Sequence, residues 1–322
     1  MLKHKIAGRQ AGILTYGMTP PKRSGDTERI AEIARKQVER LKDTGIDGLV
    51  LYDVQDEADR IDTDRPFPYL STIDPTEYSE HYLSGLVMPK IIYKVVGKQP
   101  EDELAAWIRG GQGESGGHGP VEKADRFSVF VGSSSSKQAV TMRLPEAYRL
   151  SRELNPQLAL GGVVIPERHE SKGDEHLRAA AKQEGGCSFF ISQAVYDVEA
   201  SKNFLSDYYY YCQEQEIAMA PILINLAPCG SQKTLAFMKW LGISVPKWLE
   251  NELIHSHDIL DKSIRLSRKI FEELFEFGLE KGIPIGCSVE SVSTRKVEID
   301  ASVELLREMK SYMDSRLRVG VN

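Results

Sequence analysis

The chain has 322 residues, of which 41% are hydrophobic and 27% are charged. This composition is ordinary for a globular protein and excludes a mainly disordered chain. The formal net charge is −6, whereas a general nucleic-acid binder usually carries a basic surplus, so no nucleic-acid partner is expected.

The sequence also gives no sign of a membrane or secretory segment. No run approaches the ~18 apolar residues that span a bilayer. The first eight residues, MLKHKIAG, are basic but lack the apolar centre of a signal peptide. The four cysteines form no C-x-x-C pair, which favours free thiols, a cytoplasmic protein and no metal site.

Eight apolar, β-branched runs alternate with amphipathic stretches along the chain. In chain order, strands are expected at residues 11–18, 48–54, 90–96, 126–132, 158–165, 189–195, 222–226 and 283–289. Helices are expected near residues 26–43, 75–86, 100–109, 145–154, 174–184, 199–214, 232–241, 246–255, 257–281 and 297–316. Four consecutive tyrosines, Tyr208–Tyr211, cover every face of one of these helices, which indicates a contact with other helices or with a second subunit of a homo-oligomer.

Eight strand–helix units are what a closed (β/α)8 barrel requires. No glycine fingerprint follows the first strand, where a dinucleotide-binding fold would place it. The glycine-rich residues 110–120 stand after a helix and before a strand, the reverse of a phosphate-binding loop, and are interpreted as a connection. We therefore expect an α/β fold, a single TIM-type barrel domain over residues 1–322, with extra helices after the seventh strand.

Active sites of such barrels lie at the carboxyl ends of the strands. The candidates at these ends are Tyr52, Asp53, Ser133, Glu167, His169, Gln193, Tyr196, Asp197, Asn225 and Glu290. Gln193 lies in an apolar strand, where an unpaired buried amide costs ~1–3 kcal/mol, so it is expected to face a partner or a ligand. Glu290 is similarly costly unless it forms an ion pair or faces a wet site. Asp197 has the alternative role of a helix N-cap.

Three ordered segments of the second half carry a family resemblance. Val164–His169 is VIPERH, Ser192–Glu199 is SQAVYDVE, and Ile243–Leu249 is ISVPKWL. In this order they are similar to the Y-P-E-x-H, T-Q-x-x-F-D-V-E and I-P-x-W motifs of the methylenetetrahydrofolate reductase family. The resemblance is strong over roughly residues 158–252 and weaker, but collinear, over the rest.

The resemblance implies an eight-stranded barrel that binds FAD at its mouth. It also implies transfer of reducing equivalents from NADH or NADPH through the flavin to methylenetetrahydrofolate, giving methyltetrahydrofolate for one-carbon metabolism and methionine biosynthesis. His169, Glu175 and Lys182 would contact the flavin phosphates or ribose, and Gln193 would hydrogen-bond the pterin. The further candidates are Tyr52, Gly132 and Ser133 for the cofactor and Tyr196 for the substrate.

The first half departs from the family pattern. The segment LTYGMTPPK keeps the family's Pro-Pro-Lys, but Gly17 stands where the general-acid glutamate belongs. The fourth strand ends in Gly132-Ser133, without the charges of the family's R-G-D. Because a general acid contributes about 10²–10⁴-fold in rate, Glu290, Tyr16 and Asp53 are the candidates to replace it.

Three functions compete on these observations. The first is a flavin-dependent oxidoreductase of this type, which would be yellow when purified. The second is a non-reducing relative that binds a folate or pterin as a methyl-transfer or regulatory component, and would be colourless. The third is another barrel enzyme, such as a lyase or hydrolase, but His255 and His257 are two apart and do not share a helix face that would hold a metal.

Overall fold

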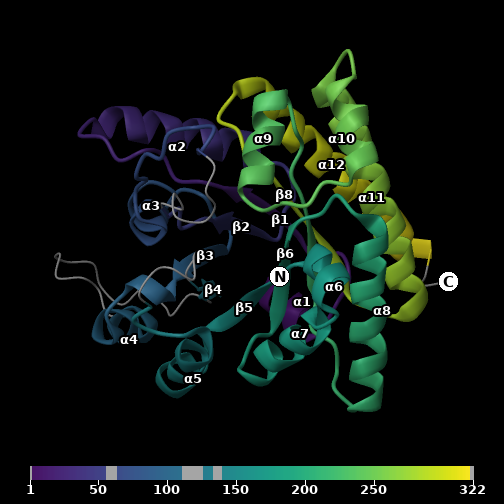
Figure 1. Ribbon diagram of the computed structural model, residues 1–322. Helices are drawn as coiled ribbons and strands as arrows, with labels where there is room; N and C mark the ends of the chain where they lie inside the picture. The colour runs from purple at the N-terminus through teal and green to yellow at the C-terminus, as the bar shows by residue number, and fades with distance from the viewer. Residues whose placement is uncertain (1, 56–63, 111–125, 133–139, 320–322) are drawn as a thin grey trace.

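The core of the protein is a closed barrel of eight parallel strands (Figure 1). The structure is a computed structural model that describes residues 2–55, 64–110, 126–132 and 140–319. The strands are β1 (Leu14–Met18), β2 (Gly48–Leu51), β3 (Lys90–Val95), β4 (Phe127–Val131), β5 (Ala159–Val164), β6 (Phe189–Ala194), β7 (Ile222–Leu226) and β8 (Ile285–Glu290). Each pairs with the next in sequence, and β1 also pairs with β8, which confirms the predicted barrel.

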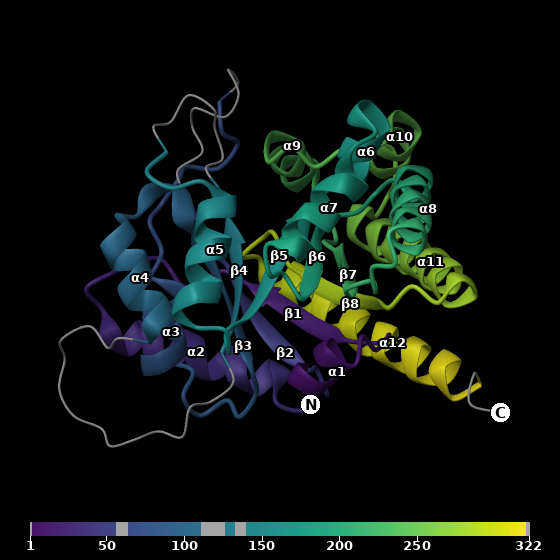
Figure 2. The ribbon, with the colours of Figure 1, turned by 90° about the horizontal axis from the view of Figure 1, so that it is seen from below.

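Helices surround the barrel (Figures 1 and 2). They are α1 (Leu2–Ala7), α2 (Thr27–Leu41), α3 (Pro75–His81), the 3-10 helix η1 (Val96–Lys98), α4 (Glu101–Arg109), α5 (Leu144–Leu154), α6 (Pro166–Lys172), α7 (Glu175–Glu184), α8 (Val198–Glu214), α9 (Gln232–Trp240), α10 (Lys247–Ile254), α11 (Ile259–Lys281) and α12 (Lys296–Val319). The extra helices predicted after the seventh strand are confirmed. None of the helices in the described part of the chain is long and apolar enough to cross a membrane.

Alternation along the strands separates two apolar layers. One cluster fills the barrel and includes Val50, Ile91, Phe127, Val129, Phe189, Ile191 and Leu223. The other lies between the barrel and its helices and includes Leu49, Ile92, Phe130, Phe190, Ile224 and Val289. A strand residue therefore faces the interior or the helices according to its position in this alternation.

The amino end of the barrel is closed by α1, a helix that the sequence analysis did not predict. Leu2 and Ile6 are 1% and 5% exposed and belong to the cluster inside the barrel. A Cβ atom on Gly48, at the start of β2, would lie 3.0 Å from Leu2 Cδ2. Figure 2 shows α1 at the opposite end of the barrel from α9. This leaves the carboxyl end as the place for a ligand.

Side-chain caps begin several of the helices. Asp26, Asp197, Ser231 and Asp258 each accept a backbone N–H at the first turn of α2, α8, α9 and α11. The alternative role of Asp197 as an N-cap is therefore confirmed. Helix α6 was not predicted, and it contains Glu167 and His169, which were expected only at the end of the fifth strand.

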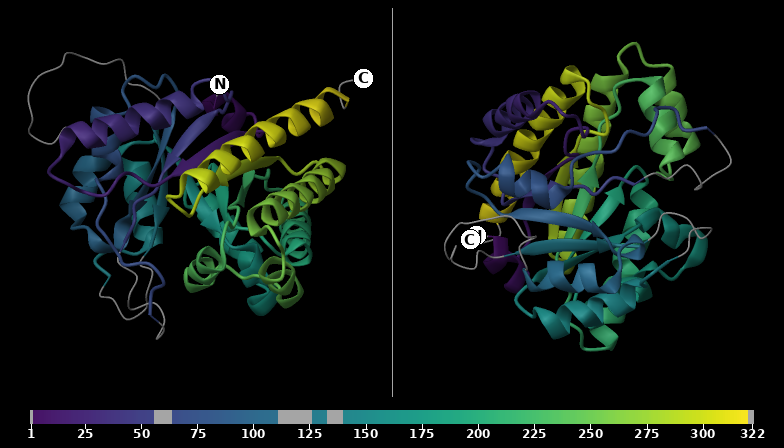
Figure 3. Two further views of the ribbon diagram at one scale, coloured as in Figure 1. Left: turned by 90° about the horizontal axis from the view of Figure 1, so that it is seen from above. Right: turned by 90° about the vertical axis from the view of Figure 1, so that its left-hand side faces the viewer.

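The last helix, α12, packs along the outside of the barrel between α11 and α2 (Figure 3). An ion pair between Arg40 and Asp300, 3.4 Å apart, joins it to α2. Of the four consecutive tyrosines in α8, Tyr208 is buried and Tyr210 is 54% exposed. Lys281 Nζ lies over the ring of Tyr210 at 5.0 Å, and the expected contact with a second subunit stays a prediction.

Candidate functional site

Polar side chains gather inside the barrel at its carboxyl end. Asn225, on β7, is 3% exposed and donates from Nδ2 to Glu290 Oε1, on β8, at 2.8 Å. Glu290 keeps some contact with solvent, yet protein atoms surround its carboxylate densely enough that burial raises its pKa. The Asn225 amide and the nearby Tyr52 hydroxyl counteract that rise in pKa. Asn225 thus holds the Glu290 carboxylate in surroundings of low polarity. A hydrogen bond from a ligand stabilises a carboxylate more strongly there than in water.

Gly17 is explained by its neighbours at this end of the barrel. It is paired in register with Glu290. A Cβ atom on Gly17 would lie 2.7 Å from Tyr52 Oη and 2.8 Å from Tyr52 Cε2. A glutamate at this position is therefore incompatible with the observed position of Tyr52, and the register partner on the adjacent strand, Glu290, brings a carboxylate to this level of the barrel.

Tyr52 is half-buried, with its hydroxyl oxygen fully buried, and its ring meets that of Tyr93 edge to face with centroids 4.8 Å apart. Burial first, and then the proximity of Glu290, raise the pKa of Tyr52 well above its usual value. The phenol thus stays protonated and can donate a hydrogen bond. Its hydroxyl lies near Glu290 but makes no hydrogen bond of good geometry within the described residues.

Several other polar atoms inside the barrel also lack a partner. They are Thr15 Oγ1, Asn225 Oδ1 and Ser288 Oγ, all buried and without a hydrogen bond to any described residue. Thr15 and Ser288 are register partners on β1 and β8, directly below Gly17 and Glu290. An unsatisfied buried polar group costs ~1–3 kcal/mol. Together with Tyr52 Oη, these atoms indicate a site for a polar ligand or for ordered water.

Glu167 adds a second carboxylate at the same end of the barrel. It lies in the first turn of α6, directly after β5, and its Oε1 accepts the Tyr196 N–H at 3.1 Å. Its Oε2 is buried without a partner in the described chain. Burial raises the pKa of Glu167 to about 7, so the protonated and charged forms coexist near neutral pH.

An arginine in the segment between β2 and α3 packs against aromatic rings of that segment and of α9. The Arg65 guanidinium lies 5.4, 5.3 and 5.2 Å from the ring centroids of Tyr69, Phe237 and Trp240. Its Nε and Nη1 atoms are buried, and no described residue accepts a hydrogen bond from them. Gln193 Nε2 donates to the carbonyl of Leu241, the residue after Trp240, at 3.4 Å, which connects this aromatic cage to the polar site. A guanidinium with two buried nitrogens and no acidic partner among the described residues indicates a site for an anionic group.

Two of the three predicted replacements for the general acid do not face the site. Tyr16 points outward, where its hydroxyl is 2.8 Å from Ser302 Oγ on α12 and only 4% of the residue is exposed. The prediction that it reaches the cavity is wrong, because its neighbour Gly17 occupies the inward position of β1. Asp53 Oδ2 accepts the Val95 N–H at 3.0 Å and so holds the end of β3. Glu290 is paired in register with Gly17 and bonds to Asn225 inside the barrel, and its role as the general acid stays a prediction.

The predicted substrate contacts also differ. Tyr196 is 2% exposed, and its hydroxyl donates to the Ala227 carbonyl at 2.5 Å. It packs with the apolar cluster under α9 and α10 rather than inside the barrel. Gln193 remains a candidate, since it is half-buried and its amide makes only one long hydrogen bond.

The residues that the resemblance assigns to FAD do not converge on the barrel mouth. His169 Nε2 lies 3.0 Å from Asp207 Oδ2 on α8. Glu175 is fully buried and accepts hydrogen bonds from Arg168 and from the Ile165 N–H. Lys182 donates to the Val163 carbonyl, and burial lowers the pKa of its ammonium group. These three side chains bond to groups of the protein outside the barrel mouth and do not fit the flavin.

The remaining cofactor candidates are at the end of β4. Gly132 follows the last residue of that strand and is half-buried. Ser133 lies outside the described residues. Sequence reasoning missed Arg65, which stands in a polar loop and has no motif around it. It did place Glu167 at a strand end, but it did not assign that residue a role.

Neither the protein-family models nor the curated proteins that were searched give a match to this chain. One solved structure matches closely: an uncharacterized protein from Clostridium thermocellum that binds two copies of 5-methyl-5,6,7,8-tetrahydrofolic acid. It is 52% identical, with a TM-score of 0.84, over 97% of this chain and 100% of that chain. The chain belongs to the same family as this protein.

More distant matches are 2,3-dimethylmalate lyase and oxaloacetate acetylhydrolase, each 13% identical, with TM-scores of 0.44 and 0.46. They cover 99% and 91% of this chain, and 98% and 80% of their own. Scores this low carry no argument about function. The kinship with methylenetetrahydrofolate reductases stays a prediction.

Proposed function

We propose that this protein binds 5-methyltetrahydrofolate at the carboxyl end of its barrel and does not reduce it through a flavin. The observation that carries the proposal is the 52% identical relative, which spans nearly the whole chain and binds two copies of that compound. The polar atoms without partners inside the barrel support it, because they need a ligand or water of matching polarity.

The pterin ring is the part of the ligand that suits the interior of the barrel. Its amino and ring N–H groups are donors, and its carbonyl is an acceptor. Glu290 presents a carboxylate to the donors, while Gln193 and Tyr52 offer an N–H and an O–H to the acceptor. A charge-assisted hydrogen bond to Glu290 would then dominate the recognition of the ring.

The glutamate tail of the folate is the part that suits Arg65. It carries two carboxylates, and the Arg65 guanidinium has two buried N–H groups free of protein partners in the described structure. The aromatic rings around Arg65 offer a surface for the aminobenzoyl group between pterin and tail. Arg65 and Glu290 would thus bind opposite ends of one molecule.

The flavin-dependent reductase, with FAD and NADH or NADPH, is the competing proposal. Two features weigh against it. Tyr52 occupies the space of the missing glutamate side chain at Gly17, and His169, Glu175 and Lys182 bond within the helical layer. A binding component of methyl transfer or of regulation requires neither a flavin nor that glutamate.

Calorimetric titration with 5-methyltetrahydrofolate, together with an absorbance spectrum of the purified protein, tests the proposal. We expect a colourless protein that binds the compound, with a stoichiometry that the titration also reports. Glu290→Gln should weaken binding roughly tenfold to a hundredfold, because it removes a charge-assisted hydrogen bond. Glu32→Gln, on an exposed turn of α2, is the matched control and should bind like the wild type.

Two results would overturn the proposal. One is a failure of the wild-type protein to bind 5-methyltetrahydrofolate. The other is a yellow protein with bound FAD that oxidises NADH or NADPH and reduces methylenetetrahydrofolate. In that case Glu290 remains the candidate general acid, and its substitution should lower turnover.

A further inference from the structure

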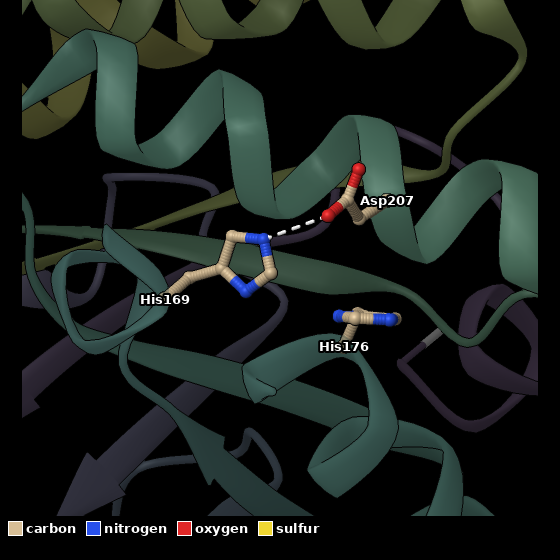
Figure 4. A group of neighbouring side chains, drawn as sticks. All are labelled: His169, His176 and Asp207. Atoms are coloured by element: carbon tan, nitrogen blue, oxygen red, sulfur yellow. Dashed lines mark hydrogen bonds and ion pairs between the residues drawn. The ribbon is translucent and has the colours of Figure 1, made fainter. Parts of the chain in front are cut away.

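A cluster of metal-binding side chains lies outside the barrel, among three consecutive helices. His169 comes from α6, His176 from α7 and Asp207 from α8 (Figure 4). One potential ligand atom from each residue lies within 4.8 Å of the other two. We propose that these three residues form a binding site for a divalent transition-metal ion, with zinc as the expected ion.

The donor set matches the chemistry of such ions. Two imidazoles and one carboxylate are ligands of zinc and its neighbours in the first transition row. Three protein ligands leave the remaining position to water. His169 Nε2 and Asp207 Oδ2 are 3.0 Å apart, a separation that one ion with bonds of about 2.0–2.2 Å can bridge. His176 lies beside this pair, since its ligand atom is within 4.8 Å of those of His169 and Asp207 and its ring meets that of His169 edge to face at 5.2 Å.

An ion bound at Nε2 of His169 leaves Nδ1 of that ring unpaired, so the ring nitrogen that an ion can satisfy is that of His176. His169 is 6% exposed, and Nδ1 of each ring is buried with no hydrogen-bond partner among the described residues. A His–Asp ion pair alone would satisfy one nitrogen of His169 and none of His176.

The surroundings allow an ion to enter. The Asp207 side chain is 55% exposed, so the cluster opens to solvent on the side of α8, while His169 forms its buried floor. The arginines of α6 and α7 have acidic partners, Arg168 with Glu175 and Arg178 with Asp174. The bound ion would join α6, α7 and α8, which makes it a structural or regulatory site rather than part of the barrel mouth.

The test uses the full chain without a histidine tag, stripped with a chelator and titrated with Co²⁺. We expect visible absorption bands of four-coordinate Co²⁺, displaced by Zn²⁺, and a rise in melting temperature with Zn²⁺. Asp207→Asn and His176→Gln should each weaken binding at least about tenfold. Asp261→Asn, whose side chain is 54% exposed, and His257→Gln are the matched controls and should bind like the wild type.

Binding of 5-methyltetrahydrofolate should be unchanged in all four variants, which shows that they fold and separates this inference from the proposed function. Two outcomes would overturn the metal site. One is a wild-type protein that takes up neither ion. The other is binding that survives Asp207→Asn and His176→Gln at full strength, which would place the ion elsewhere.

Discussion

The two ends of the barrel differ in how well their side chains are satisfied. At the amino end, Leu2 and Ile6 of α1 pack against apolar residues, and the cluster is closed. At the carboxyl end, the hydroxyls of Tyr52 and Ser288 and the amide oxygen of Asn225 are buried without partners in the described chain. The apolar packing at the amino end stabilises the fold by itself. At the carboxyl end, the unpaired polar atoms lower the free energy of unfolding, and a ligand that bonds to them would restore it.

The largest expected effect is on stability, from a substitution at the amino end of the barrel, which α1 closes. Ile6→Ala removes a side chain that is 5% exposed and leaves a cavity under the barrel. We expect a loss of about 2–5 kcal/mol in the free energy of unfolding, with little change in affinity for 5-methyltetrahydrofolate. Urea denaturation and calorimetric titration of the same variant measure the two quantities. A large loss of affinity would mean that the two ends are coupled.

The next prediction concerns the packing at the open end. Gly17→Ala places a Cβ atom 2.7 Å from Tyr52 Oη. The variant should be destabilised by about 1–3 kcal/mol, because the tyrosine must move. Combining it with Tyr52→Ala removes the clash, so a double-mutant cycle in urea should show a coupling of similar size. Additive effects would contradict this explanation of Gly17.

The pH dependence of stability should distinguish the buried Glu167 from an exposed carboxylate. Burial raises its pKa to about 7 in the folded protein, against 4.5 for the ordinary value. The folded state therefore binds more protons than the unfolded state between these values, and stability should fall as pH rises from about 5 to 8. We expect the wild type to lose roughly 1–3 kcal/mol more than Glu167→Gln over this range. Parallel stability curves for the two proteins would show that the carboxylate is not desolvated.

The smallest effect compares two tyrosines on adjacent strands. Tyr16→Phe removes a hydrogen bond to Ser302 outside the barrel and should cost about 0.5–1.5 kcal/mol, without altering folate affinity. Tyr52→Phe removes a hydroxyl with no protein partner in the described structure, so it should leave stability almost unchanged and weaken ligand binding. Both are measured by urea denaturation and titration. The reverse pattern would place the ligand outside the barrel.

The open end was predicted in outline but not in its contacts. The strand positions of Gln193, Asn225 and Glu290 follow from apolar runs, because parallel strands bring their carboxyl ends together. Successive side chains of a strand point to opposite faces, so whether Tyr16 or Gly17 faces the barrel interior depends on the exact position of β1 in the barrel. Predicted to start at residue 11, this strand begins at Leu14, and a prediction of boundaries alone does not decide which face a residue takes.

The helical layer shows a different limit. His169 and Lys182 match family motifs, yet their side chains bond to Asp207 and to the Val163 carbonyl. A motif states which residue stands at a position, but the rotamer depends on neighbours that are distant in sequence. Arg65 gave no signal at all, since its aromatic cage comes from α9 and from its own loop.

The sequence by itself determined the barrel, because eight apolar runs of strand length, separated by amphipathic helices, close in no simpler way. It also determined that polar residues stand at the carboxyl ends of those strands. Only the tertiary structure decided which of them lack partners. Satisfaction of a buried polar atom depends on what other strands and helices bring within hydrogen-bonding distance. For Asn225 that is one carboxylate, on β8, whereas the hydroxyls of Tyr52 and Ser288 make no hydrogen bond of good geometry to any described residue.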